Sequence, residues 1–249
     1  MKDPRLPTPR ADELQGRVIA ITGAGDGIGR AVAMDAARHG AQVILIGRTV
    51  KKLQAVHRDI VAAHGDVATM APLDLEKALA GDYDTLAAAI LERYGRLDGL
   101  VHCAGILGTL TPLDQYDVPT WCKVLHVNAT AAFVLTQVLL PALKKSADAA
   151  VIFTSSSVGR QGRAYWGAYA VSKFAVEGLA QVLAAEMQGS SPVRVNVLNP
   201  GATRTLMRRQ AFPSENAEAL ATPEAIAPAY VALLGSRAGE LNGLSLDCQ

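Results

Sequence analysis

The stretch that decides the fold is RVIAITGAGDGIGRAV, residues 17–32. Its first half is an aliphatic run that stops at Gly23, and its second half has the apolar spacing of a helix. Gly23, Gly27 and Gly29 lie in the turn between them. Such a turn lets the backbone approach a pyrophosphate, toward which a helix beginning near Ile28 would aim its free N–H groups. The stretch therefore predicts a dinucleotide-binding turn, and a tight turn without a ligand is the less favoured alternative.

The composition is that of an ordinary folded domain. Half of the 249 residues are hydrophobic, and 24 Lys and Arg against 23 Asp and Glu leave a net charge of +1. This balance argues against a nucleic-acid or membrane-surface partner. The three cysteines form no C-x-x-C pair, which favours a reducing compartment without disulfides. No apolar stretch looks long enough for the ~18 residues of a membrane span. We therefore expect a cytoplasmic protein.

Strands and helices alternate along the rest of the chain. Strands are expected at 17–23, 41–47, 66–75, 97–105, 149–157, 192–201 and 243–248, and helices at 28–40, 49–65, 83–95, 117–145 and 165–187. The strands are continuous apolar runs, which is typical of a parallel sheet with helices on both faces. The pattern predicts an α/β chain: a single-domain, doubly wound parallel sheet (Rossmann fold) of about seven strands.

This domain is expected to span residues 16–249. Residues 1–15 contain three prolines and no apolar signal core, and we expect them to form a loosely ordered N-terminal arm. Residues 203–222 are the least regular segment of the domain. They follow the sixth strand, where an open α/β sheet places its ligand crevice, and are expected to form a lid.

The end of the second strand bears on the choice of cofactor. At the position where NAD sites usually offer an acidic residue, this chain has Gly47 followed by Arg48. A guanidinium suits a 2′-phosphate because it is permanently charged and can bond two oxygens. The sequence therefore favours NADP(H) over NAD(H). Asp26 in the glycine-rich turn argues mildly the other way, because a second cation is often found there.

A tyrosine and a lysine lie four residues apart in AYAVSKFAVEG, at Tyr169 and Lys173. On a helix, this spacing puts both side chains on one face. A tyrosine hydroxyl titrates near ~10, and a fixed ammonium nearby lowers that pKa. The pair is thus a candidate general acid/base for a carbonyl/alcohol couple, although taken alone it could also be a solvated helix face.

Taken together, these residues resemble the short-chain dehydrogenase/reductase family over nearly the whole domain. TGAGDGIG fits the family's T-G-x-x-x-G-x-G turn, HCAG resembles its N-N-A-G, and YAVSK fits its Y-x-x-x-K. VNAT and NPGATRT resemble two further family segments. The run FTSSSVGRQGRAYWGAYAVSKF, with NPGATRT and AFPSE, is most similar to the YciK-like bacterial oxidoreductases.

The resemblance implies a catalytic set. Tyr169 would exchange a proton with the substrate oxygen, while Lys173 would lower the tyrosine pKa and bind the nicotinamide ribose. Ser156 would hydrogen-bond the substrate oxygen, because the family serine lies about thirteen positions before the tyrosine and has a glycine, here Gly159, three positions on. Asn128 would hold a water of a proton relay.

The resemblance also implies cofactor contacts, with Asp74 facing the adenine and Thr205 near the carboxamide or pyrophosphate. The full set is Gly23, Gly27, Ile28, Gly29, Arg48, Asp74, Leu75, Ala104, Gly105, Tyr169, Lys173, Pro200, Gly201, Thr203 and Thr205. The chain departs from the family at His102 and Cys103, which replace the two asparagines of N-N-A-G. We interpret Cys103 as a packing residue rather than a nucleophile. The scattered histidines predict no metal site.

The leading hypothesis is an NADP(H)-dependent oxidoreductase that acts on a small-molecule carbonyl or alcohol. The alternatives are a catalytically silent dinucleotide-binding regulator and a 3-oxoacyl thioester reductase. In the lid, Arg204, Arg208 and Arg209 could attract an anionic substrate or could simply be solvated. The helix over 174–187 has more apolar surface than one core-facing stripe needs, and the resemblance implies a homodimer or homotetramer.

Overall fold

The first strand, β1 (Val18–Thr22), lies inside the sheet and pairs in parallel with β2 (Gln42–Gly47) and β4 (Gly99–His102). The computed structural model describes residues 2–249. Its seven strands are parallel and lie in the order β3-β2-β1-β4-β5-β6-β7. The other strands are β3 (Ala68–Pro72), β5 (Ala149–Thr154), β6 (Val193–Asn199) and β7 (Ser245–Asp247), of which β3 and β7 form the edges. The predicted fold class is confirmed.

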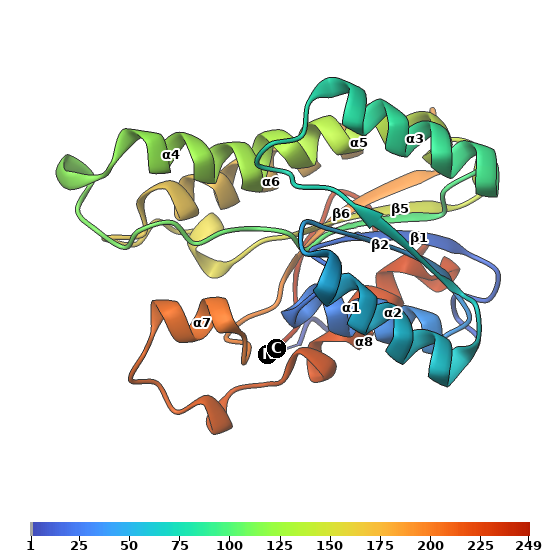
Figure 1. Ribbon diagram of the computed structural model, residues 1–249, viewed down its shortest axis with the longest axis horizontal. Helices are drawn as coiled ribbons and strands as arrows, with labels where there is room; N and C mark the ends of the chain where they lie inside the picture. Colours follow the sequence, from blue (N-terminus) through green and yellow to red (C-terminus); the bar gives the residue numbers. More distant parts are fainter. Residues whose placement is uncertain (1) are drawn as a thin grey trace.

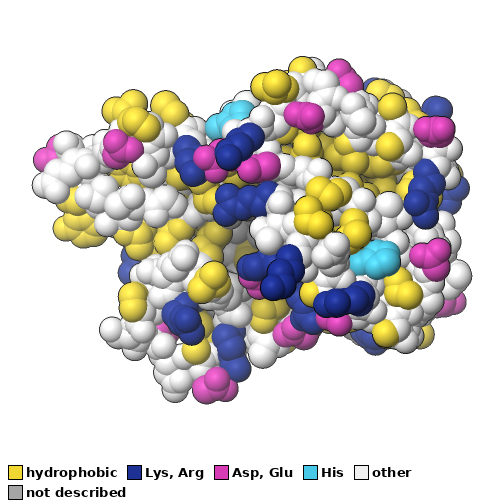
Figure 2. Space-filling view, viewed as in Figure 1, with side chains coloured by type: hydrophobic (Ala, Val, Ile, Leu, Met, Phe, Trp, Pro, Cys, Tyr) yellow, Lys and Arg dark blue, Asp and Glu magenta, His cyan; other side chains and the backbone are white. Residues whose placement is uncertain are grey.

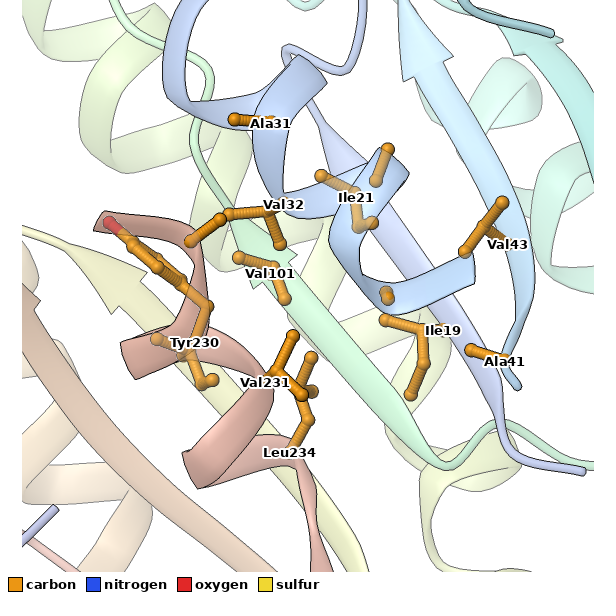
Figure 3. Close-up of a cluster of buried hydrophobic side chains, with 14 of the residues drawn as sticks. Ile19, Ile21, Ala31, Val32, Ala41, Val43, Val101, Tyr230, Val231 and Leu234 are labelled. Carbon is orange, nitrogen blue, oxygen red and sulfur yellow. The ribbon is translucent and has the colours of Figure 1, made fainter. Parts of the chain in front are cut away.

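Helices cover both faces of the sheet (Figure 1). One face carries α1 (Gly27–Arg38), α2 (Val50–His64) and α8 (Pro223–Leu234), and the other carries α3 (Ala80–Tyr94), α4 (Val118–Leu125), α5 (Ala131–Leu143) and α6 (Gly167–Met187). Figure 3 shows Val32 of α1 and Val231 of α8 against Ile19 and Ile21 of β1. Burial on both faces explains why β1 is apolar from Val18 to Ile21.

The chain reverses its winding direction between β1 and β4. After β1 it builds β2 and β3 on one side, and it then returns to place β4 to β7 on the other side. At such a switch point the loops after neighbouring strands diverge and leave a crevice at the carboxyl ends of the strands. The glycine-rich turn follows β1, and the serine run follows β5. The sheet order therefore opens a crevice next to both motifs.

The apolar stretch in the helix expected at residues 117–145 is longer than the sequence analysis judged it to be. The helices α4 and α5 join through a π-helical segment, His126–Thr130, into a continuous helix of 26 residues, Val118–Leu143. Its length and composition would allow it to cross a membrane, whereas the sequence analysis expected no stretch of that length. Leu135 and Leu139 are fully buried in a core cluster that also contains residues of α3 and α6. We interpret it as a core helix.

The sequence analysis missed α8. Thr222 caps this helix by accepting a hydrogen bond from the N–H of Ala225 (3.2 Å), and Pro223 occupies the first turn. A second proline, Pro228, lies inside the helix and obscured the pattern. The signal that could have found it is the Thr-Pro-Glu start, which is typical of a helix N-terminus.

The N-terminal arm, which was expected to be loosely ordered, packs against the domain and lies beside the C-terminus. Leu6 and Leu14 are buried in the core beside α1 and α8, and the N–H of Asp3 donates to the carbonyl of Asp247 (2.9 Å). The termini therefore lie side by side (Figure 1). The N-terminal arm is packed, because burial of its two leucines stabilises it in spite of its three prolines. The predicted lid contains α7 (Leu206–Ala211) and a short 3-10 turn, Ala217–Ala219.

Candidate active site

A cleft of about 820 Å³ opens at the carboxyl ends of the strands. Figure 2 shows the molecule hollowed there, with Lys and Arg side chains gathered at the rim. All fifteen residues predicted to contact a cofactor line this cleft, and so does Ser156. Asn128 does not line it. The motifs that lie far apart in the sequence thus meet at one place.

The glycine-rich turn is fixed by contacts between the ends of β1 and β4. Gly23 has a φ of +66°, and a Cβ there would lie 2.9 Å from the backbone nitrogen of Ala104. Thr22 Oγ1 accepts hydrogen bonds from the N–H groups of Cys103 and Ala104, both at 3.1 Å. Only glycine fits this approach, because its φ is positive and no room is left for a side chain.

Two cations lie where β2 gives way to α2. Arg48 Nη1 is 3.7 Å from Glu76 Oε2, and Lys52 Nζ donates to the carboxylate of Asp26. The lysine lowers the pKa of Asp26, so the carboxylate stays ionised and its charge is neutralised. Asp26 therefore presents no unpaired negative charge that would disfavour NADP(H). Sequence reasoning missed Lys52, although its spacing of four from Arg48 was a signal.

Tyr169 and Lys173 project from the same side of α6. Lys173 Nζ lies 5.5 Å from the centroid of the Tyr169 ring and donates to the carbonyl of Thr154 (2.7 Å). Burial lowers the pKa of Lys173 to about 8 and raises the pKa of Tyr169 to about 12, against a hydrogen bond with Ser156 that lowers it. The net shift of the tyrosine pKa is upward, because burial outweighs this hydrogen bond. The expected lowering of the tyrosine pKa by Lys173 stays a prediction.

The three serines after β5 have three different environments. Ser155 is buried, and its hydroxyl has no hydrogen-bond partner. Ser156 is half-buried, has an extended backbone and lines the cleft. Ser157 is exposed and begins a 3-10 turn that ends at Gly159. A Cβ at Gly159 would lie 2.7 Å from Lys173 Cβ, so the turn packs directly on the lysine stem.

Asn128 lies in the π-helical segment and is buried. Its Oδ1 accepts from the N–H of Ile106 (2.8 Å), and its Nδ2 donates to the Ile106 carbonyl (2.9 Å) and to Ser172 Oγ (3.0 Å). The amide is therefore fully engaged in tying the loop after β4 to α6. Its side chain holds this loop in place, and the expected role of Asn128 in holding a water stays a prediction.

Of the two family departures, His102 is buried, and Cys103 is partly buried and lines the cleft. His102 Nε2 lies 2.8 Å from Thr136 Oγ1, and its ring stacks on Phe153 at 4.8 Å. Burial lowers the pKa of His102 to about 3, so the imidazole is neutral. Burial raises the pKa of Cys103 to about 11, which keeps the thiol protonated and supports its reading as a packing residue. Within residues 2–249, no cluster of three His, Cys, Asp or Glu side chains could hold a metal ion.

One carboxylate links the loops after β5 and β6. Arg160 Nη1 and Asn199 Nδ2 both donate to Asp247 Oδ1, each at 2.8 Å. Arg160 Nε also donates to Ser245 Oγ (2.9 Å). Arg160 follows the turn after Ser156, and Asn199 precedes the Pro-Gly segment. The sequence analysis did not identify this link, because its three residues lie on separate elements.

Comparisons with known proteins agree with this geometry. A family model described as short chain dehydrogenase matches residues 17–216. The uncharacterized oxidoreductase YciK of Escherichia coli (strain K12) is 48% identical over 241 residues, which is 97% of this chain and 95% of the relative. The predicted resemblance to YciK-like oxidoreductases is therefore confirmed.

Two solved structures are similar over nearly the whole chain. A short chain dehydrogenase from Shigella flexneri 2a, complexed with NADP, has a TM-score of 0.94 and 48% identity, and the match covers 96% of this chain and 100% of that one. A short chain dehydrogenase from Escherichia coli CFT073, complexed with NADPH, has a TM-score of 0.94 and 49% identity, with 97% and 100% covered. Sequence, fold and site geometry agree, and the chain belongs to the short chain dehydrogenase family.

Proposed function

We propose that this protein is a cytoplasmic, NADP(H)-dependent oxidoreductase that transfers hydride between the nicotinamide and a carbonyl/alcohol substrate, with Tyr169 as the general acid/base. The observation that carries the proposal is the convergence of the glycine-rich turn, Arg48 and the group of Ser156, Tyr169 and Lys173 in one cleft. The relatives crystallised with NADP and NADPH support the choice of cofactor.

The cleft has a suitable contact for each part of NADP(H). The backbone around Gly23 and the N-terminus of α1 suit the pyrophosphate, because no Cβ blocks the approach and free N–H groups face it. Arg48 suits the 2′-phosphate, because its guanidinium is exposed and lies 3.7 Å from Glu76, whereas Lys52 is bonded to Asp26. Asp74 and Leu75 would contact the adenine, and residues 200–205 would contact the carboxamide. When bound, the nicotinamide supplies or accepts the hydride.

The protein's own residues orient the substrate and move the proton. The Ser156 and Tyr169 hydroxyls would both hydrogen-bond the substrate oxygen. In reduction Tyr169 Oη donates its proton to this oxygen, and in oxidation it takes the proton back. A positioned acid of this kind contributes about 10²–10⁴-fold to a rate. Lys173, held by the Thr154 carbonyl, supplies positive charge beside the ring.

The test is NADPH oxidation across a panel of ketones and aldehydes, with Tyr169→Phe as the comparison. We expect the variant to lose about 10²-fold or more in kcat and to keep its affinity for NADPH, because the phenyl ring is retained. A variant that binds NADPH and matches the wild type on every substrate would sink the enzymatic role of Tyr169. A wild type that binds NADPH and turns over no substrate would favour the catalytically silent regulator.

The cofactor preference has its own test. Arg48→Asp removes a guanidinium and adds a like charge, so we expect the preference for NADPH over NADH to fall by about 10–100-fold. Arg58→Asp is a matched control, because Arg58 is exposed on α2 and does not line the cleft. An unchanged ratio of the two kcat/KM values in Arg48→Asp would contradict the assignment.

A further inference from the structure

Ionisable side chains are unevenly distributed along the cleft. Near the glycine-rich turn and the ends of β2 and β3 the lining includes Asp26, Arg48, Lys52, Asp74, Glu76 and Lys123. Around Tyr169 and α7, the lining among residues 2–249 contains two cationic side chains, Lys173 and Arg208, and no carboxylate. The substrate end thus has no acid to pair with a cationic substrate, and at most two cations to pair with an anionic one.

Both of those cations already have partners. Lys173 Nζ donates to the Thr154 carbonyl at 2.7 Å. Arg208 Nε and Nη2 donate to the two carboxylate oxygens of Glu215, both at 2.6 Å, and its guanidinium lies 3.9 Å from the centroid of the Phe212 ring. The arginine lowers the pKa of Glu215, so the pair stays ionised at neutral pH.

The other two lid arginines do not offer an anionic substrate a cation in the cleft. Arg204 Nη1 lies 3.1 Å from Glu218 Oε2, and neither Arg204 nor Arg209 lines the cleft. Two lid arginines are therefore balanced by acids of the same segment. An anionic substrate group at the Tyr169 end of the cleft would have to displace Glu215 from Arg208, or it would lose water without gaining a partner, and both are unfavourable.

The side chains that line the cleft beside Tyr169 are mostly apolar, and the Arg163 guanidinium, outside the lining, lies 5.9 Å from the Trp166 ring centroid. Tyr169 belongs to a buried cluster with Leu107, and Trp166 and Met207 pack against that cluster. The Trp166 ring lies 5.7 Å from the Tyr169 ring and 5.7 Å from the Phe212 ring, centroid to centroid. A planar apolar group next to the tyrosine would gain contact area on Trp166 and Met207.

On these grounds we propose that the substrate is an uncharged ketone or aldehyde, or the matching alcohol, with an apolar and preferably aromatic body that packs on Trp166 and Met207. Carboxylic acids, amines and phosphate-bearing thioesters are disfavoured. The inference rests on the proposed oxidoreductase function and specifies its substrate class. Two lid residues, Glu215 through Arg208 and Met207 through direct contact, determine this specificity.

The first test uses a matched pair of ketones, methyl para-acetylbenzoate and para-acetylbenzoate. Turnover with NADPH and binding to the protein–NADPH complex by calorimetry are both measured. We expect the neutral ester to exceed the carboxylate by about 10-fold or more in kcat/KM and in affinity, because a carboxylate here lacks a free partner. A carboxylate that equals or exceeds the ester overturns the proposal, and so does a failure of the ester to bind.

The second test releases the arginine. Glu215→Gln keeps the shape of the side chain but removes its charge, so Arg208 becomes available to an anion. We expect kcat/KM for the carboxylate to rise about 3–10-fold, with the ester unchanged. Glu218→Gln is the matched control, because Glu218 pairs with Arg204 outside the cleft. An equal rise in both variants, or in neither, contradicts the role of the Arg208–Glu215 pair.

The two proposals fail differently. If the ester binds more tightly than the carboxylate but neither is turned over in a Tyr169-dependent manner, the oxidoreductase function fails and the binding preference stands. If Tyr169-dependent turnover is present but favours the carboxylate, the substrate class is wrong and the function stands. Trp166→Ala provides a third test, since it should weaken binding of the ester more than binding of the carboxylate.

Discussion

The three consecutive serines differ in what each hydroxyl can reach. Ser156 lines the cleft, Ser155 is buried without a hydrogen-bond partner, and Ser157 is exposed. We expect Ser156→Ala to lower kcat by about 10²-fold, because it removes a hydrogen bond to the reacting oxygen. Ser155→Ala and Ser157→Ala should change kcat less than about threefold, since neither removes a bond made to substrate. Equal losses in all three variants, measured by NADPH oxidation, would contradict the assignment.

A single histidine makes stability depend on pH. His102 has a pKa of about 3 in the folded protein against the model-peptide value of 6.5, so below pH 6.5 the unfolded chain binds a proton that the folded chain refuses. The contribution of the neutral His102 to the unfolding free energy is complete above pH 6.5 and is lost as the pH falls toward 3. Between pH 6.5 and 5, the unfolding free energy from urea titrations should fall by up to about 1.4 kcal/mol per pH unit. His102→Asn should flatten this slope, and identical slopes would show that His102 is not the cause.

The sequence motifs and the family resemblance together predicted which residues gather at the cleft, but they did not predict what all of these residues do. Gly23, Ser156, Tyr169 and Lys173 belong to motifs whose positions follow from the order of strands and helices. The engagement of Asn128 with Ile106, the pairing of Lys52 with Asp26 and the hold of Thr154 on Lys173 depend on contacts through space. Such contacts leave no periodic signal in the chain.

At the scale of the element, the short turn after β5 is packed against α6 without spare room. A Cβ at Gly159 would lie 2.7 Å from both Lys173 Cβ and Ser155 Oγ. Gly159→Ala should therefore push the turn and α6 apart, costing about 1–3 kcal/mol of stability and lowering kcat through displaced Ser156 and Lys173. Gly162→Ala is the matched control, because a Cβ there meets nothing within 4 Å. Thermal unfolding and NADPH oxidation should separate the two variants, and equal behaviour would contradict the packing argument.

The elements that the sequence predicted well are those with one uninterrupted period. The continuous apolar strands and the helices α1, α2 and α6 are of this kind. The helix α8 was missed because Pro228 breaks its pattern, although Tyr230 makes it one of the best-buried elements. The Tyr230 hydroxyl lies 3.0 Å from Thr154 Oγ1, so this missed helix supports the residue that holds Lys173. Tertiary packing stabilises α8 in spite of its local sequence.

For the whole molecule, the exposed apolar side chains of α5 and α6 bear on assembly. Phe133, Phe174 and Val182 are exposed there. We predict that a second copy of the chain covers this surface, so that light scattering at micromolar concentration gives two or four times the chain mass. Val182→Asp should shift the mass toward the monomer, whereas Val50→Asp on α2, also exposed, should not. A monomeric wild type would contradict the prediction.

The shared carboxylate of Asp247 limits how the active site can be changed by evolution or by engineering. Because Arg160 and Asn199 donate to the same oxygen, a substitution in one loop alters the partner available to the other. Changes selected singly on the serine loop and on the Pro-Gly loop would therefore not add when they are combined. A library that varies both loops together with Asp247 would reach combinations that stepwise selection, one position at a time, passes over.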